Sequence, residues 1–303
     1  MKHPLIQAVI QEIEREILGK SREIEFVLIA FFSQGHVLIE DLPGMGKTSL
    51  AKAISNAFQL DFQRVQGSTD LLPSDIIGVS IFNPKTQEFS FQEGPVFTEI
   101  LLFDEMNRTP PKTQSALLQV MAEQLVTVDQ QTYELKDPFF VIGTQNPSSS
   151  EGTYKLPESQ LDRFSMRLSL GYPQRDFEKN ILLKKENQGV CSSFSRDEIL
   201  SLQKQAQEVH LDEKLIDYIL SLVELTRSDP RLIHGISVRG SQELVRLAKT
   251  RAYFEGRDFI IPEDIKSLAP YVWSHRIQSL DLPDRVSQEE YILSVMNQIS
   301  IPI

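Results

Sequence analysis

Cysteine is almost absent from this sequence of 303 residues, which contains only Cys191. A single cysteine excludes an internal disulfide framework and fits a reducing compartment, so we expect Cys191 to be a bystander in a linker. Long apolar runs are absent as well, since the longest, residues 26–32, is far shorter than the roughly 20 residues that span a bilayer. Charged side chains interrupt residues 6–18, which predicts an amphipathic helix and not a signal sequence. We therefore expect a soluble, cytoplasmic protein with no membrane span.

An excess of positive charge is also missing. The chain has 42 acidic and 31 basic residues, which gives a formal net charge of −11 at pH 7. A protein that binds duplex DNA normally carries a basic surface, because it must neutralise phosphates. A local basic patch remains compatible with this charge, but we do not expect nucleic acid as the partner. The length favours two domains, and the composition is that of an ordinary globular protein, 41% hydrophobic and 24% charged.

Short apolar runs alternate with helical patterns in the first half of the chain. They predict buried strands at residues 36–40, 99–104, 139–144 and 165–170. The helix that follows the first of these strands is predicted at residues 48–58. Continuous apolar strands separated by helices indicate a parallel sheet covered on both faces. Polar turns at residues 83–86 and 129–131, each between two short extended runs, predict two β-hairpins.

Beyond residue 173 the pattern is helical only. Ser195 and Glu198 form a capping box, and Asp212 precedes a second amphipathic stretch. A third helix is predicted over residues 239–255 with a stop at Gly256, and Pro262 begins a fourth. We therefore predict an α/β domain, a parallel-sheet αβα sandwich at residues 1–180, followed by an all-helical domain at residues 181–303.

A glycine-rich loop, DLPGMGKT at residues 41–48, joins the first predicted strand to the following helix. This context is the one that a phosphate-binding loop requires. Gly44 and Gly46 let backbone amides curl around the phosphates at the positive end of the helix. Lys47 would contact the β- and γ-phosphates, and the Thr48 hydroxyl would bind Mg²⁺. A chance glycine-rich turn is the structural alternative.

The first glycine of that motif is replaced by Asp41, and aspartate tolerates left-handed backbone conformations better than most residues.

The cofactors predicted are ATP and Mg²⁺. The residues predicted to bind ATP in this loop are Gly44, Met45, Gly46, Lys47, Thr48 and Ser49.

Acidic and amide side chains follow the next two buried strands. Asp104 ends the strand at residues 99–104, where it would hold Mg²⁺ through its water shell, and Glu105 could act as the general base. An Asp-Glu pair at a strand end can also be a solvated helix cap. Asn146 follows the strand at residues 139–144 and could orient the attacking water, although an asparagine before Pro147 is also a common turn former.

These spacings resemble the MoxR family of AAA+ ATPases. The matching segments are residues 40–48, 104–114, 143–147, 151–154, 156–164, 237–241 and 271–277, so the resemblance covers nearly the whole chain. The family often carries aspartate at the position of Asp41. Met106, Gly143 and Val238 depart from its usual residues, and none of the three is a proposed ligand.

The resemblance implies an AAA+ fold, with a helical lid, that assembles into a homo-oligomeric ring, usually a hexamer, with ATP at each subunit interface. Arg163 matches the arginine finger that would reach the γ-phosphate of the neighbouring subunit, acting in trans. Arg108 is a second finger candidate, and a salt bridge with Asp162 is the structural alternative for Arg163. Arg239 matches the sensor arginine of the lid and would contact the phosphates of its own subunit; without the resemblance it reads as an exposed first-turn residue.

Two further segments take roles from the same resemblance. Leu18 and Gly19 match the segment that lines the adenine site, so we expect both to bind ATP. The hairpin at residues 125–135 resembles the presensor insertion, an element that lines a pore or contacts substrate.

Three functional hypotheses follow. The first is an ATPase that drives chaperone-like remodelling or maturation of client proteins, including cofactor or metal insertion, with a von Willebrand factor A-domain partner as the resemblance implies. The second is a nucleotide-gated assembly scaffold with little turnover, against which Asp104, Glu105 and Arg163 argue. The third, a DNA-dependent motor, is disfavoured by the net charge.

Overall fold

The computed structural model describes residues 3–147, 152–154, 156–183, 194–279, 281–282 and 284–301. Cys191, with the linker role expected for it, and Glu151 of the family-like segment lie outside the described residues. No helix in the described part of the chain is long and apolar enough to cross a membrane.

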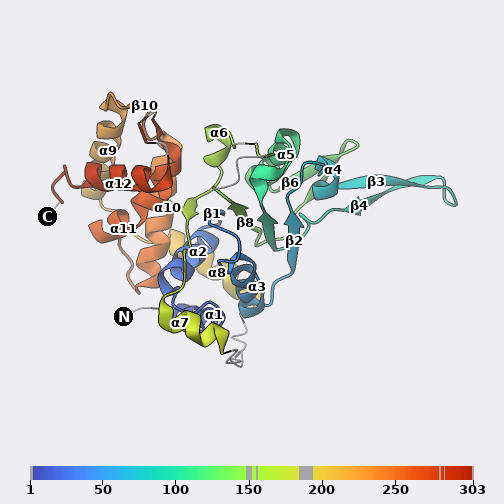
Figure 1. Ribbon diagram of the computed structural model, residues 1–303, viewed down its shortest axis with the longest axis horizontal. Coiled ribbons are helices and arrows are strands. Elements are labelled where there is room, and N and C mark those ends of the chain that lie inside the picture. Colours follow the sequence, from blue (N-terminus) through green and yellow to red (C-terminus); the bar gives the residue numbers. More distant parts are fainter. Residues whose placement is uncertain are drawn as a thin grey trace.

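Helices and strands alternate through the first half, and helices dominate the second (Figure 1). The strands are β1 (Val37–Glu40), β2 (Phe62–Gln66), β3 (Gly78–Asn83), β4 (Glu88–Glu93), β5 (Ile100–Asp104), β6 (Leu125–Val128), β7 (Gln131–Glu134), β8 (Phe140–Gln145), β9 (Met166–Leu168), β10 (Leu232–His234) and β11 (Gln278–Ser279). The α-helices are α1 (Pro4–Glu16), α2 (Ser21–Phe32), α3 (Lys47–Phe58), α4 (Pro73–Ile77), α5 (Pro111–Glu123), α6 (Glu158–Leu161), α7 (Arg175–Leu182), α8 (Arg196–Gln207), α9 (Glu213–Ser228), α10 (Val238–Phe254), α11 (Pro262–Trp273) and α12 (Arg285–Met296).

Five strands form one parallel sheet in the order β2-β5-β8-β1-β9. The four buried strands predicted from the sequence are β1, β5, β8 and β9, and the parallel arrangement is confirmed. Because all strands run the same way, their carboxyl ends lie at one edge, where Glu40 pairs with Gln145 and Gln66 with Asp104. The loops that carry the chemistry therefore meet at that edge.

Successive residues of the central strands point to opposite faces of the sheet. Ile100 and Leu102 pack in a core with α1, α2 and α3, whereas Leu101 and Phe103 pack in a second core with α5. In Figure 1 the strands lie between α5 on one side and α1, α2 and α3 on the other. This arrangement is the predicted αβα sandwich.

The edge strand β2 was not predicted. Its sequence is FQRVQ, and Val65 is its one buried residue, so the strand contains no run of buried apolar side chains. Without a continuous apolar run, nothing in the sequence distinguishes this segment from a polar loop.

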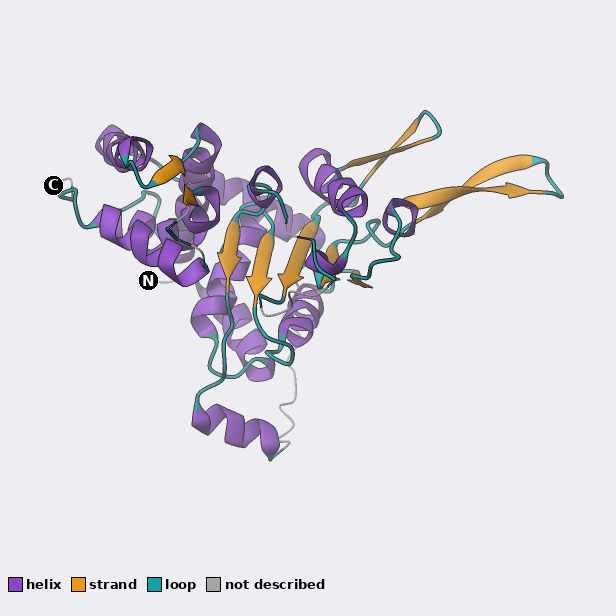
Figure 2. Cartoon of the chain, turned by 45° about the horizontal axis from the view of Figure 1, so that its top comes forward, coloured by secondary structure: helices purple, strands orange, loops and turns teal. Residues whose placement is uncertain are grey.

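The two predicted hairpins are present as β3–β4 and β6–β7, each a separate antiparallel pair. Both project away from the sheet (Figures 1 and 2). The ring of Phe91 in β4 stacks on that of Tyr133 in β7, with 4.2 Å between centroids, so the hairpins support each other.

The helical lid is confirmed and lies beside β9 (Figure 1). Ser195 and Glu198 form the predicted capping box at α8, and Gly256 has a φ of 70° just beyond α10. The prediction of helices alone was incomplete, since β10 and β11 form a short antiparallel pair within the lid. Strands of three and two residues, far apart in sequence, leave no periodic signal.

The lid and the sandwich share one hydrophobic core. Residues of α8 to α12 pack in the same cluster as α1, α2 and α3. Ser33 Oγ donates to Thr250 Oγ1 at 2.7 Å and Gln203 Nε2 to the Phe31 carbonyl at 3.0 Å. The predicted boundary between residues 180 and 181 falls within α7 and stays a prediction.

Burial fixes His36, just before β1, in its neutral form. The backbone N–H of Val141 donates to its Nδ1 at 3.1 Å, so Nε2 carries the proton that it shares with the Met121 carbonyl, also at 3.1 Å. Desolvation lowers the pKa of His36 from 6.5 to about 4. The imidazole is 4% exposed.

We expect His36 to make the protein less stable in acid. The unfolded chain protonates this histidine below about pH 6.5 and the folded chain only near pH 4, so stability present at neutral pH is lost as pH falls between these values. The loss should reach about 2–3 kcal/mol by pH 4.5. Urea unfolding of the wild type and of His36→Gln at pH 7.5 and 4.5 measures it. The difference in unfolding free energy between the two proteins should be smaller at pH 4.5 than at pH 7.5. An equal difference at both pH values would contradict a neutral, buried His36.

Candidate active site

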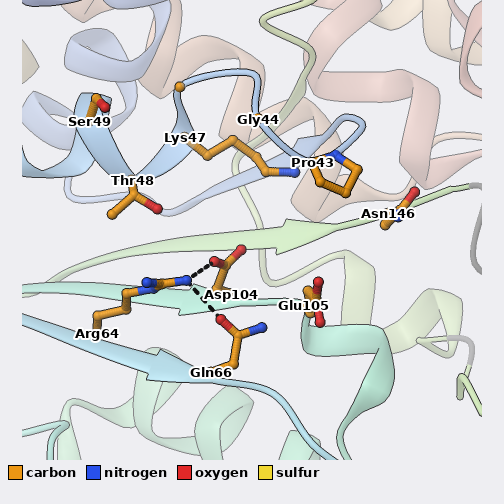
Figure 3. Close-up of a pocket in the computed structure, with 11 residues that line it drawn as sticks. Pro43, Gly44, Lys47, Thr48, Ser49, Arg64, Gln66, Asp104, Glu105 and Asn146 are labelled. Carbon is orange, nitrogen blue, oxygen red and sulfur yellow. Dashed lines mark hydrogen bonds and ion pairs between the residues drawn. The ribbon is translucent and has the colours of Figure 1, made fainter.

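The glycine-rich loop leaves β1 and ends where α3 begins. Gly44 and Gly46 both have a φ of 86°, which L-residues rarely adopt, and a Cβ on Gly44 would meet no atom within 4 Å. The glycine there is thus required by backbone angle and not by space. Lys47 Nζ donates to the Asp41 carbonyl at 2.8 Å and to the Leu42 carbonyl at 3.3 Å. Its ammonium group lies over the concave side of the loop (Figure 3).

This loop forms one wall of a cleft with a volume of about 410 Å³. The residues that line the cleft are Pro43, Gly44, Gly46, Lys47, Thr48, Ser49, Arg64, Gln66, Asp104, Glu105 and Asn146. They come from the loop, from α3 and from the carboxyl ends of β2, β5 and β8, as Figure 3 shows. The sequence predicted most of this set, and the fold brings it together. Met45 does not line the cleft.

Asp104 and Glu105 lie at the end of β5 in different environments. Asp104 Oδ1 accepts a hydrogen bond from Thr144 Oγ1 at 2.6 Å, and its Oδ2 accepts one from Arg64 at 2.7 Å. Glu105 has a φ of 54°, which turns its side chain out of the strand, and its N–H donates to Thr144 Oγ1 at 2.9 Å. The carboxylate of Glu105 pairs with Arg108 at 3.0 Å. Thr144 therefore fixes both acidic residues.

Asn146 follows β8 and lines the cleft on the side of Glu105 (Figure 3). Its carbonyl accepts a hydrogen bond from Asn107 Nδ2 at 3.3 Å, which ties the end of β8 to the residues after β5. The two departures from the family pattern near here contact each other. A Cβ on Gly143 would lie 2.5 Å from Met106 Sδ and 2.9 Å from Phe164, so the glycine makes room for the methionine.

The two predicted arginines lie outside the cleft lining. Arg163 is partly exposed, and among the described residues it forms no ion pair. The alternative of a salt bridge between Arg163 and Asp162 is wrong for this structure, because Asp162 binds Arg276 at 2.7 Å and Arg239 at 3.5 Å. Arg239, in the first turn of α10, therefore contacts the sandwich through Asp162. Arg108, the second finger candidate, does not line the cleft either and pairs with Glu105 of its own subunit.

The segment predicted at the adenine reaches the other end of the loop. A Cβ on Gly46 would lie 4.0 Å from Ile17 Cδ1, which places residues 17–19 beside the phosphate loop. Gly19 has a φ of 74°, and a Cβ there would meet the Phe177 ring at 2.4 Å. Leu18 and Gly19 do not line the cleft itself, and their role at the adenine stays a prediction. Phe177 had no sequence signal.

The expected reason for Asp41 is wrong. Asp41 has no positive φ, and it is 6% exposed. Its carboxylate accepts three hydrogen bonds from the chain that follows β9, from Ser169 Oγ at 2.6 Å and from the N–H groups of Leu170 at 2.5 Å and Gly171 at 3.2 Å. It joins the start of the phosphate loop to the segment that leads towards the lid.

Restoring the glycine of the motif at position 41 should therefore harm the protein. Asp41→Gly leaves one buried donor, the N–H of Leu170, and two partly buried donors without an acceptor, for which we expect a loss of about 2–4 kcal/mol of unfolding free energy. Asp41→Asn, which keeps one acceptor oxygen, should lose less. Denaturant unfolding measures both, and a glycine variant as stable as the wild type would contradict this role.

The donor set fits a nucleotide with Mg²⁺. No group of three or more His, Cys, Asp or Glu in the described chain could hold a metal by itself. The Thr48 hydroxyl and the Asp104 carboxylate are hard oxygen ligands, and Mg²⁺ is commonly held by one or two such groups together with phosphate oxygens and water. Mg²⁺ would neutralise charge on the phosphates when bound.

A parallel sheet with these residues at its carboxyl edge defines a P-loop nucleoside triphosphatase. Residues 36–166 match the ATPase family associated with various cellular activities (AAA), and residues 224–294 match the AAA lid domain. The chain is 41% identical to YeaC of Bacillus subtilis, over 99% of this chain and 96% of that protein.

Two further comparisons agree. The chain is 36% identical to the chaperone MoxR1 of Mycobacterium tuberculosis, over 99% of this chain and 83% of that one. The crystal structure of a proposed ATPase from Cytophaga hutchinsonii superposes with a TM-score of 0.88 at 35% identity, over 99% of this chain and 95% of that one. The chain belongs to the MoxR family of AAA ATPases, and its activity is ATP hydrolysis.

Proposed function

We propose that this ATPase uses hydrolysis of Mg²⁺–ATP to remodel or mature client proteins in the cytoplasm. The observation that carries the proposal is the cleft itself, which gathers a phosphate loop, two acidic residues and an amide from three different strands. The similarity to the chaperone MoxR1 supports a chaperone-like role. The proposal includes a client that receives a cofactor or metal. It also includes a partner protein with a von Willebrand factor A-type domain.

The cleft residues that the sequence predicted take the following roles. Lys47 and the amides of the loop hold the phosphates, and Thr48 and Asp104 hold Mg²⁺. Glu105 accepts the proton of the attacking water, because its carboxylate projects into the cleft from outside the strand. Asn146 positions that water from the end of β8.

The cleft is completed by a second copy of the chain. Arg163 lies outside the cleft of its own subunit and is partly exposed, which suits a residue that serves the neighbouring subunit in a hexameric ring. Arg239 of the lid pairs with Asp162, which precedes Arg163 in the chain. Making or breaking this ion pair would therefore couple the position of the lid to the position of Arg163. We propose that nucleotide binding draws Arg239 towards the phosphates.

Client capture tests the proposal. The Glu105→Gln variant, held with ATP, should co-purify a client and partner that Lys47→Ala does not retain, because the lysine variant cannot hold the phosphates. Wild-type protein with ADP is the control for the state after hydrolysis. Identical sets of proteins on both variants would contradict a nucleotide-driven remodeller.

A nucleotide-gated scaffold is the second candidate. The presence of Asp104 and Glu105, both hydrogen-bonded to Thr144, disfavours it, since a scaffold does not require a general base. Steady-state turnover at concentrations where the ring forms separates the two. Oligomerisation that depends on ATP without measurable hydrolysis would favour the scaffold, and stimulation by DNA at physiological salt would favour a DNA-dependent motor.

A further inference from the structure

We propose that Arg64 is a positioning residue that occupies the magnesium-binding carboxylate of Asp104 and is displaced from it by Mg²⁺. The inference rests on the role proposed above for Asp104. Arg64 belongs to β2, the edge strand that the sequence did not reveal, and it lines the same cleft as Thr48 and Asp104.

The guanidinium group of Arg64 binds the carboxylate oxygen of Asp104 that Thr144 does not contact. Thr144 takes Oδ1, and Arg64 Nη2 donates to Oδ2 at 2.7 Å and to Gln66 Oε1 at 2.8 Å. Figure 3 shows the arginine extended across the floor of the cleft towards both acceptors. The side chain of Asp104 is 13% exposed, so an anion there needs a cation or donors on each oxygen.

The same oxygen is the one that hydrated Mg²⁺ would use. Thr144 comes from the neighbouring central strand β8 and has a buried side chain, so its hydrogen bond to Oδ1 is structural. Oδ2 accepts from Arg64, which lines the cleft, so it is the oxygen that Mg²⁺ held there would use. The Arg64 guanidinium and the hydrated Mg²⁺ are therefore alternative partners of one acceptor.

Arg64 can leave, because its side chain is 45% exposed and an ion pair of that exposure is weak. Arg64 already lines the cleft while it is paired with Asp104, so in either state its fixed charge adds to that of Lys47 opposite the phosphates. Without Mg²⁺, the arginine supplies part of the charge that ATP requires. With Mg²⁺, it is a competitor that sets how much of the ion is needed.

The two roles give Arg64→Gln opposite effects in two binding measurements. In EDTA, we expect ATP to bind about three- to tenfold more weakly, because a cation facing the phosphates is gone. In a titration with Mg²⁺ at fixed ATP, we expect the half-saturating Mg²⁺ concentration to fall about three- to tenfold, because the competitor is gone. Equilibrium binding of a fluorescent ATP analogue reads out both without turnover. Arg64→Lys, which keeps the charge but cannot form the planar fork, should shift the Mg²⁺ requirement in the same direction by less.

Lys52→Gln removes a cation from the exposed side of α3, outside the cleft lining, and should change neither quantity. A half-saturating Mg²⁺ concentration that stays the same or rises in Arg64→Gln overturns the inference, because a merely structural arginine would weaken both measurements together. Asp104→Asn separates this failure from that of the proposed site. If that variant keeps the wild-type Mg²⁺ requirement, the role of Asp104 itself is wrong. If it needs more Mg²⁺ while Arg64→Gln is unchanged, only the role of Arg64 is wrong.

Discussion

The Glu105→Gln variant should bind Mg²⁺–ATP as well as the wild type does and hydrolyse it about 10²–10⁴-fold more slowly. An amide of the same size cannot accept the proton of the attacking water, and loss of a general base has an effect of this order. The fold should be unaffected, because the backbone N–H of Glu105 keeps its hydrogen bond to Thr144 and the carboxylate pairs with Arg108, which is half-exposed. Steady-state phosphate release and equilibrium nucleotide binding measure the two halves of the expectation.

Glu123→Gln provides the matched control for this measurement. Glu123 ends α5, accepts a hydrogen bond from Gln119 at 3.1 Å and does not line the cleft. Its turnover should equal that of the wild type. Near-normal hydrolysis by Glu105→Gln would remove Glu105 as the base, and loss of binding would show that its role is in holding the nucleotide.

Arg163→Ala should lower turnover about 10³–10⁵-fold, the range seen when an arginine finger is missing. Because the finger is proposed to act on the neighbouring subunit, a mixture of Arg163→Ala with Glu105→Gln should recover activity that neither variant has alone. In a ring assembled at random from equal amounts, about one interface in four combines an intact Glu105 with an intact Arg163. Phosphate release from the mixture, compared with each variant, is the measurement.

The same mixing experiment decides between the two finger candidates. Arg108 pairs with Glu105 of its own subunit at 3.0 Å, so Arg108→Ala should act in cis, and its mixture with Glu105→Gln should not recover. If activity recovers in the mixture with Arg108→Ala but not in the mixture with Arg163→Ala, Arg108 is the finger that acts in trans and Arg163 is not. No recovery in either mixture, with ring formation retained, would contradict a finger in trans.

The phosphate loop and the acidic pair could be predicted because their signals are local. A short apolar run before residues 41–48 is a buried strand, and the glycines at 44 and 46 are needed for backbone angles that few other residues adopt. Asp104 and Glu105 follow a second apolar run, and a parallel sheet brings the ends of such strands to one edge. Even the lid was visible, through its capping residues and its 3.6-residue periodicity.

Asp41 and Arg64 show what the sequence could not provide. The carboxylate of Asp41 is explained by partners at Ser169, Leu170 and Gly171, which are close to it only in the folded chain. Arg64 lies on a strand whose polar sequence carries no apolar pattern, and its partner Asp104 belongs to the neighbouring strand.

The sequence by itself determined which loop and which strand ends supply most of the cleft lining, because backbone angles, strand burial and helix caps depend on residues near in the chain. Only the tertiary structure decided which charged groups face each other: Arg64 with Asp104, Arg108 with Glu105, and Asp162 with both Arg239 and Arg276. Such pairs depend on the order of the strands and on the docking of the lid. Side chains that meet in this way share no periodicity along the chain, so their pairing has no signature in a single sequence.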